Sequence, residues 1–268
     1  MTRGVWRTSP ATLLCAASLA ASSCGTPLLK LPTGTGTPAT DGAAAVAQAT
    51  SACRAINTIT LEMSVHGTVG GRRLRGRLSA GLARPASARL EAVAPFGQPI
   101  FVFVAMDDDA SLLLPRDRRV LEHGKPADVL EAVSGVPLDA AALRFLVTGC
   151  AEAPDAERAT AFGDDWRAVR DGPATVYLRR SGADAPWRLV ARIRQGAWRA
   201  DYSKFDNDLP HAVHLVSRPA GRFDLQLDLS QIELNVALGP EAFKRPQAGT
   251  ATPIGLEELR QSGPLGEK

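Results

Sequence analysis

Apolar and polar residues alternate along most of the chain, with the period of two that is typical of β-strands with one buried face. Residues 58–67 and 72–82 show this most clearly, because apolar or small residues occupy every second position of both runs. Residues 88–92, 174–180, 187–195, 197–205 and 211–218 have the same pattern. Residues 223–236 change parity between Leu229 and Ile232, which predicts a bulge or turn near Ser230 and Gln231.

Two further runs, residues 100–106 and 112–114, are apolar at every position, which predicts strands that are covered on both faces. Helical patterns interrupt the strands. Residues 42–57 have apolar side chains at helical spacing. Residues 126–133 begin with a proline that suits a first helical turn, and Asp139 can cap a helix over residues 140–147 that ends at Gly149. We expect residues 151–172 to be a loop with at most a short helix, and residues 256–260 to be helical.

Roughly ten consecutive strands interrupted by helices predict an α+β fold that is mainly β. We expect one curved antiparallel sheet, a half-barrel, with the helices forming a lid on its concave side over an apolar cavity. A filled core has the same residue pattern, so both a hollow and a filled interior fit the sequence. The candidate lining residues of a cavity are Leu61, Met63, Val65, Leu74, Leu78, Leu90, Ile100, Val102, Leu143, Leu146, Trp198, Leu225 and Leu227.

The first residues have the features of an export signal. Residues 1–23 contain two arginines and no acidic residue, and they include an apolar stretch over residues 11–21. This stretch is too short to span a membrane, and small residues and Cys24 follow it, as at a signal-peptide cleavage site. The site resembles the lipid-attachment box of bacterial lipoproteins, which implies that Cys24 carries acyl chains. The alternative is a secreted protein with a free thiol at Cys24.

The rest of the chain divides into a tether, a domain and a tail. Residues 24–42 are rich in Gly, Thr and Pro, which predicts a lipidated cysteine followed by a flexible tether. Residues 43–239 contain the strands and helices of one domain, and residues 240–268 form a Pro-rich tail. After the leader no apolar run approaches the roughly 20 residues of a membrane helix, so we expect attachment to a membrane through lipid alone.

Charge and cysteine content add further constraints. The formal net charge is +3 and part of it belongs to the leader, so we expect no nucleic-acid partner. Arg73, Arg75 and Arg77 alternate with apolar or small residues, which predicts the solvated outer face of a strand. Cys53 and Cys150 remain when the leader and Cys24 are set aside, and in an exported protein they form either a disulfide or two separately buried thiols. We expect a monomer.

The sequence does not contain a recognisable catalytic or metal-binding arrangement. His211 and His214 point to opposite faces of one strand, and His66 and His123 are isolated near turns. Residues 107–109 are three aspartates that lack the spaced oxygen ligands of a calcium loop, and they predict a hairpin turn. A P-loop, a nucleophile elbow and a His-Glu-x-x-His motif are all missing from the sequence. We therefore expect a protein that is not an enzyme and that holds neither a metal nor another cofactor.

One loop and the helices after it resemble a known family. Residues 90–100 run from strand to strand through Pro95, Phe96 and Gly97, and this tight turn predicts an exposed Phe96. The alternative is that Phe96 packs under the edge of the sheet. The loop resembles the Asn-Pro-Leu-Gly turn of the outer-membrane lipoprotein receptor LolB, with Phe96 in the place of an exposed leucine. Residues 133–138 and 143–149 resemble the family's Thr-Gly-x-Pro segment and the Leu-Arg helix that follows it.

The resemblance extends in order over residues 58–236 and implies both a fold and a function. The LolA/LolB-like fold is an open half-barrel with a helical lid. The implied function is to take acylated lipoproteins from a periplasmic carrier of the LolA type, hold their acyl chains in the cavity and deliver them to the outer membrane. The loop at Phe96 would contact the membrane, and the lipid-anchored protein would face the periplasm. The alternatives are a lipoprotein that binds another apolar ligand, such as a phospholipid or glycolipid, and a structural envelope-assembly lipoprotein without a ligand.

Overall fold

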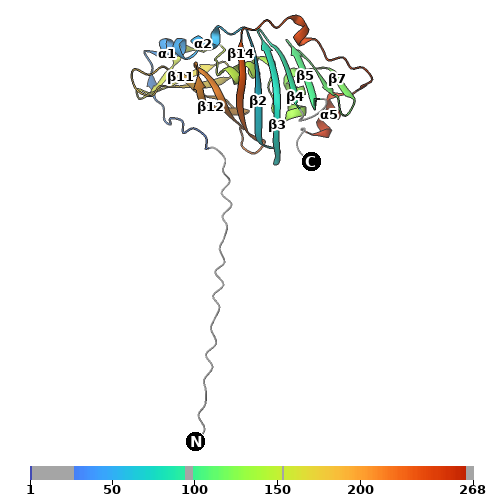
Figure 1. The fold of residues 1–268 in the computed structure, drawn as a ribbon. Helices are drawn as coiled ribbons and strands as arrows, with labels where there is room; N and C mark the ends of the chain where they lie inside the picture. Colours follow the sequence, from blue (N-terminus) through green and yellow to red (C-terminus); the bar gives the residue numbers. More distant parts are fainter. Residues whose placement is uncertain (2–26, 94–98, 153, 264–268) are drawn as a thin grey trace.

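A curved sheet of 15 strands organises the molecule (Figure 1). The structure is a computed structural model that describes residues 1, 27–93, 99–152 and 154–263. Neighbouring strands are antiparallel, except that the two-residue strand β15 pairs with β7 in parallel. The mainly β, open half-barrel predicted from the sequence is confirmed, and it has more strands than expected.

Most strands follow one another as hairpins, and the order in the sheet is β1-β8-β9-β10-β11-β12-β13-β14-β2-β3-β4-β5-β6-β7-β15. Pairing of β14 with β2 joins the two halves of the chain into one surface. The bounds are β1 Thr37–Pro38, β2 Thr58–Val69, β3 Arg72–Ala83, β4 Ser87–Val93, β5 Phe101–Met106, β6 Asp109–Leu114, β7 Arg119–Gly124, β8 Thr160–Phe162, β9 Trp166–Asp171, β10 Ala174–Arg179, β11 Arg188–Arg194, β12 Trp198–Asp206, β13 Leu209–Ser217, β14 Phe223–Leu234 and β15 Thr252–Pro253.

Helices pack against the inner face of this sheet. Helix α1 (Gly42–Ala49) contacts β9, β10 and β11 and is followed by the short α2 (Ser51–Arg54). Helix α3 (Pro126–Ser134) contacts β6, and α4 (Ala140–Thr148) contacts β3, β4 and β13. Two 3-10 turns, η1 (Ala156–Arg158) and η2 (Pro240–Phe243), and the helix α5 (Leu256–Ser262) complete the described elements. None of these helices is long and apolar enough to cross a membrane.

Local sequence signals set the ends of α3 and α4. Pro126 occupies the first turn of α3, where its missing N–H removes no helical hydrogen bond. Asp139 caps α4, because its Oδ1 accepts a hydrogen bond from the Ala142 N–H at 2.7 Å. Gly135 and Gly149 end the two helices with left-handed φ angles of 78° and 61°. The start of α3, the cap of α4 and its end at Gly149 are confirmed.

Two predicted elements need correction, and the strand β7 was not predicted. The helix expected over residues 42–57 is interrupted at Thr50, whose φ is −113°. Residues 151–172, expected to be a loop, contain β8 and β9, and β7 was not expected at all. The reason is clearest in β9, where the inward positions include Arg167 and Asp171, which are each paired with a residue of opposite charge. A strand whose buried face is partly ionic has no apolar alternation to detect.

The outer face of β5 is covered as well as its inner face. Phe101 and Phe103 pack into the main core, whereas Val102 and Val104 are buried on the opposite face against Phe243. The prediction that this apolar strand is covered on both sides is therefore confirmed. The parity change expected near Ser230 and Gln231 is also present, as a register shift in the pairing of β14 with β2.

The described parts of the segments predicted as a tether and a tail contact the rest of the fold. The Leu29 N–H donates to the Asp201 carboxylate at 2.7 Å, and the Leu29 carbonyl accepts from Arg199. β1 then pairs with β8, so residues 29–42 are not a free tether. At the other end, β15 extends the sheet beyond β7 and α5 packs on α3 with Leu259 buried. Backbone groups and apolar side chains in both segments find partners that their composition does not reveal.

A disulfide joins Cys53 to Cys150, whose Cα atoms are 5.7 Å apart. It links α2 to the residue after Gly149 at the end of α4, over a sequence separation of 97 residues. A cross-link of this span restricts the unfolded chain, and native disulfides typically contribute about 2–4 kcal/mol to stability. Of the two arrangements that the sequence left open for these cysteines, the structure has the bridged one.

We predict that replacing both Cys53 and Cys150 by Ala lowers the free energy of unfolding by about 3 kcal/mol and the Tm by roughly 10 °C. Thermal denaturation with and without a reductant measures the effect, since the reductant should lower the Tm of the wild type and leave the double variant unchanged. Reactive thiols at Cys53 and Cys150 in the denatured, unreduced protein would contradict the bridge.

Candidate functional site

An apolar cavity of about 90 Å³ lies between the inner face of the sheet and the lid formed by α3 and α4. Its lining residues are Met63, Val65, Leu74, Leu78, Leu90, Phe101, Leu130, Ser134, Val136, Leu138, Leu143, Leu146, Val147, Leu215, Leu225 and Leu227. Ser134 is the one polar side chain among them, and its hydroxyl donates to the Leu130 carbonyl at 2.7 Å. The surface can therefore hold hydrocarbon, and it has no unpaired polar side chain with which to orient a polar group.

One inward position of the sheet next to the cavity, Gly76, has no side chain. In the β2–β3 pair, Gly76 lies opposite Val65 and between Leu74 and Leu78, which all line the cavity. A Cβ built on Gly76 meets no atom within 4 Å, and Gly76 is exposed although it belongs to the inner face. At Gly67, in contrast, a Cβ would lie 2.0 Å from a backbone oxygen. Gly76 therefore marks the place where the cavity opens to solvent.

The structure gathers most of the predicted lining residues around this cavity. Those in place are Met63, Val65, Leu74, Leu78, Leu90, Leu143, Leu146, Leu225 and Leu227. Four other assignments are corrected. Leu61 is buried in the core, and Ile100 packs against the core. Neither residue lines the cavity. Val102 lies on the outer face of β5, because that strand is apolar at both parities and the sequence does not show which side faces inward. Trp198 lines a different pocket.

Several lining residues were missing from the sequence-based set. Leu130, Val136, Leu138 and Val147 belong to α3, α4 and the segment between them. The apolar spacing of the helices indicates a buried face, but it does not show that this face lies above a hollow. Gly76 was also missed, although a glycine at an inward position of an alternating strand is a signal of missing side-chain volume.

A polar pocket of about 100 Å³ lies on the other flank of α4. Phe145 and Trp198 line it together with Arg192. The Arg192 guanidinium forms an ion pair with Asp171 at 2.8 Å and donates to the Cys150 carbonyl at 3.1 Å. The Asp171 side chain is fully buried, so this pair lies in a region of low dielectric. It ties β9 and β11 to the end of α4.

Other buried polar groups accompany this pair. The hydroxyl of Tyr202 and the indole nitrogen of Trp198 make no hydrogen bond with a described residue, and burial raises the pKa of Tyr202. Burial and the nearby charge of Arg84 lower the pKa of Arg144, whose guanidinium lies 4.4 Å from the centre of the Phe145 ring. The inner face of the sheet is thus polar on one side of α4 and apolar on the other.

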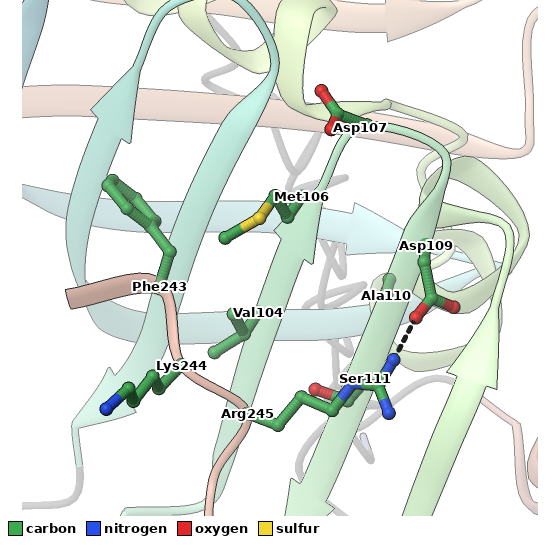
Figure 2. Close-up of a pocket in the computed structure, with 9 residues that line it drawn as sticks. All are labelled: Val104, Met106, Asp107, Asp109, Ala110, Ser111, Phe243, Lys244 and Arg245. Atoms are coloured by element: carbon green, nitrogen blue, oxygen red, sulfur yellow. Dashed lines mark hydrogen bonds and ion pairs between the residues drawn. The ribbon is translucent and has the colours of Figure 1, made fainter. Parts of the chain in front are cut away.

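A cavity of about 350 Å³ lies on the outer face, where the tail crosses β5 and β6 (Figure 2). It is lined by Val104, Met106, Asp107, Asp109, Ala110, Ser111, Phe243, Lys244 and Arg245. Figure 2 shows Arg245 reaching across to Asp109, and Lys244 pairs with Glu241 at 2.8 Å. Because both cations are already paired, neither is free to select an anionic ligand.

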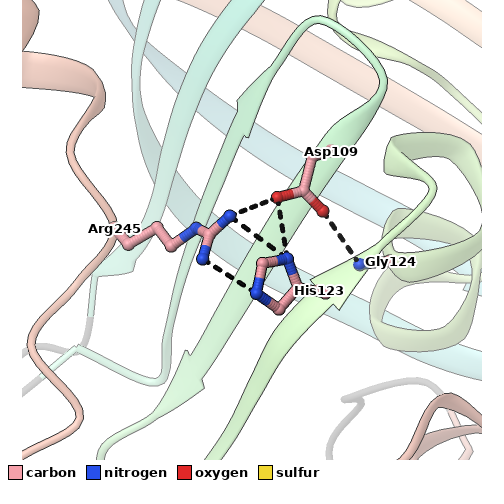
Figure 3. A network of polar contacts seen from close by, with 4 residues as sticks. All are labelled: Asp109, His123, Gly124 and Arg245. Carbon is pink, nitrogen blue, oxygen red and sulfur yellow. Dashed lines mark hydrogen bonds and ion pairs between the residues drawn. The ribbon is translucent and has the colours of Figure 1, made fainter.

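A small polar network fixes the tail beside this cavity (Figure 3). His123 Nδ1 lies 3.1 Å from the Asp109 carboxylate, and Arg245 Nη1 lies 3.0 Å from His123 Nε2. Arg245 Nη2 also lies 3.1 Å from His123 Nδ1 and donates to the Asp109 carboxylate, so the guanidinium contacts both ring nitrogens and the carboxylate. Burial opposes ionisation of Asp109, but contacts with His123 and Arg245 outweigh it and keep the pKa of Asp109 below its ordinary value. The sequence context suggested that His123 is isolated, but in the structure it contacts Asp109 and Arg245.

Two predicted sites lie outside the described residues. These are the lipid-attachment residue Cys24 and the membrane-contact loop of Pro95, Phe96 and Gly97. The strands that flank the loop are described, and Val93 at the end of β4 pairs with Arg77, next to Gly76. Within the described ranges, His, Cys, Asp and Glu side chains do not gather in a group that could hold a metal ion.

Comparison with solved structures relates this architecture to known folds. A LolA superfamily protein from Nitrosomonas europaea matches with a TM-score of 0.56 and 11% sequence identity, over 76% of this chain and 97% of that chain. The fold of this chain is therefore similar to the fold of that LolA superfamily protein. A DUF1329 family protein from Desulfovibrio piger matches this LolA-like fold with a TM-score of 0.50 and 11% identity, over 78% of this chain and 98% of that chain. Comparisons of the sequence with protein-family models and with curated proteins find no match.

The buried ion pair of this LolA-like fold gives a test of its inner face. We predict that Asp171→Ala lowers the free energy of unfolding by about 3–5 kcal/mol, because Arg192 stays buried without its carboxylate. Denaturant unfolding measures the change. The control is Asp228→Ala, which breaks the exposed pair with Lys204 and should cost less than about 1 kcal/mol. Equal losses in the two variants would contradict the role assigned to the buried pair.

Proposed function

We propose that the protein is a lipid-anchored carrier that binds an acyl chain in the apolar cavity beneath α3 and α4. Its cargo is an acylated lipoprotein, taken from a periplasmic carrier of the LolA type and delivered to the outer membrane. Acyl chains on Cys24 hold the protein at that membrane, where it faces the periplasm. The binding step involves neither covalent chemistry nor a cofactor.

The composition of the cavity wall carries this proposal. Every lining side chain is apolar except Ser134, whose hydroxyl is already paired. An acyl chain that leaves water gains about 0.8 kcal/mol for each buried methylene, so a wall of this kind holds it without a specific polar contact. Release then requires a second apolar environment, and a bilayer provides one. The same physics therefore supports both uptake and delivery.

The size of the cavity indicates that the lid must move. Its volume of about 90 Å³ is well below the roughly 300–1,000 Å³ of typical ligand sites, so a long chain enters only when α3 and α4 separate from the sheet. The disulfide at Cys150 holds the end of α4 beside α2. The left-handed Gly135 and the following Val136 and Pro137 separate the two helices. In this proposal the lid opens while its disulfide end stays in place.

Filling the cavity from Gly76 tests the binding step. We predict that Gly76→Phe weakens the binding of an environment-sensitive fatty-acid probe at least tenfold, because the ring occupies the open space at the mouth. The Tm should stay the same or rise, since glycine weakens a strand interior. The matched control is Ser79→Phe, which adds the same ring to the outer face of the same strand. Fluorescence titration of the full chain and both variants measures the affinities.

Two results of this titration would contradict the proposal. One is wild-type affinity in Gly76→Phe, which would locate the probe elsewhere. The other is an absence of probe binding to the wild type, which would favour the structural lipoprotein with a closed core. Native mass spectrometry of the purified protein then distinguishes the ligand classes, because a lipoprotein acyl chain, a phospholipid and a glycolipid differ in mass.

The delivery step depends on the loop at Phe96. We predict that Phe96→Glu leaves the fold and probe binding unchanged and stops the transfer of a labelled lipoprotein to vesicles, because a carboxylate does not enter a bilayer. Phe96→Leu, which introduces the residue of the family that the loop resembles, is the control and should retain transfer. Normal transfer by Phe96→Glu would remove the loop from the mechanism.

A further inference from the structure

The two ends of the sheet carry opposite charge. The strand register puts the β2–β3, β6–β7 and β13–β14 turns at one end and the β3–β4, β5–β6, β8–β9, β10–β11 and β12–β13 turns at the other. The described charged residues in the first set of turns are Arg116, Asp117, Arg118, Arg218 and Arg222. Those in the second set are Asp107, Asp108, Asp164, Asp165, Asp184 and Asp208, with Arg84 and Arg180. The small formal net charge of +3 given by composition hides this separation.

The β2–β3 hairpin adds more arginines to the basic end. Arg72, Arg73 and Arg75 are exposed, and none of them forms an ion pair or side-chain hydrogen bond with another described residue. The residues opposite Arg73 and Arg75 on β2 are Thr68 and His66, so no carboxylate faces them there. We call the arginines of this hairpin and of the first set of turns the basic rim. In Figure 1 the tip of β3 projects at the lower edge of the sheet.

The cavity opens beside the same arginines. Gly76, which marks the mouth, directly follows Arg75, and the two residues face opposite sides of the sheet. Leu74, on the inner face between Arg73 and Arg75, lines the cavity. A flat surface that contacts Arg73 and Arg75 at this end of the hairpin therefore lies next to the apolar opening at Gly76.

The chain at Leu29 is also held near this end of the sheet. Leu29 is bound to Arg199 and Asp201 on the outer face of β12. One row of paired residues crosses the sheet from Arg199 to Arg73, through Val216, Asp224 and Thr68. Four strand spacings separate the two arginines, so their backbones are about 19 Å apart. Cys24 precedes Leu29 by five residues, so it lies within about 17 Å of it even when that segment is fully extended. Acyl chains on Cys24 would therefore bring a bilayer to the basic rim.

We propose that the basic rim docks on a bilayer surface that carries anionic headgroups, with Arg72, Arg73 and Arg75 against lipid phosphates. Unpaired guanidinium groups match this surface, because each basic side chain close to anionic lipid strengthens binding about fivefold. The docked orientation points the mouth at Gly76 toward the lipid. This inference deepens the proposed function, and it rests on that function for the reason why the protein docks. The docking itself needs no bound cargo.

Vesicle flotation of the full chain tests the rim. The vesicles are made of phosphatidylcholine alone or with phosphatidylglycerol, and every variant keeps the same leader, so its contribution cancels in the comparison. We expect the triple variant Arg72→Gln, Arg73→Gln, Arg75→Gln to bind the anionic vesicles at least tenfold more weakly than the wild type. Substitution of the same three residues by Lys should preserve binding. At about 1 M salt, where charges are screened beyond about 3 Å, the difference should vanish.

A charge-matched control separates the rim from net charge. Arg54→Gln, Arg179→Gln, Arg188→Gln removes three positive charges near the acidic end of the sheet and should change binding less than twofold. Equal loss in both triple variants, equal binding of the rim variant and the wild type, or equal binding to both kinds of vesicle would each overturn the proposal. The rim variant should keep wild-type affinity for the fatty-acid probe. A protein that binds anionic vesicles through the rim but binds no probe would instead refute the proposed function and leave the docking intact.

Discussion

A curved sheet has to cover its concave face, and the rest of this structure follows from how the chain meets that requirement. α4 lies against the inner face and touches β3, β4 and β13. Space remains beside it on both flanks. On the flank toward β2 and β3, Gly76 contributes no side chain, and an apolar space remains that opens to solvent. The capacity to hold hydrocarbon is thus a consequence of incomplete packing at a defined place.

The pocket on the other flank is polar, and paired charges lie beside it. Arg192 pairs with the buried Asp171, and Arg167 forms two hydrogen bonds with Asp41, at 2.6 and 2.9 Å. The hydrogen bond from Arg167 holds the pKa of Asp41 below its ordinary value. These pairs fix β9 and β11 to α1 and to the end of α4, beside the disulfide at Cys150. A half that is fixed by ion pairs and the disulfide and a half with an apolar cavity therefore share one sheet, and the fixed half would serve as the base of the proposed movable lid.

The sequence predicted this fold where burial is apolar on one face. Alternation located β2, β3 and β12, and capping residues located α4, because these signals are local. It failed where the buried face carries paired charge, as at Arg167 and Asp171 in β9. For the site, alternation identified which strand residues face inward. It could not assign Val102 to the outer face, since both faces of β5 are apolar. Nor could it show that the tail covers Val102, because that contact joins segments far apart in the chain.

A crystal structure of the protein with a brominated long-chain fatty acid tests the central claim most directly, because the bromine atoms locate the chain without ambiguity. The account predicts that the chain lies between α4 and the β2–β3 pair, next to Gly76, with α3 and α4 displaced from the sheet and the disulfide end unmoved. A chain found in the outer-face cavity beside Phe243, or an interior that stays closed and empty at saturating fatty acid, would contradict it.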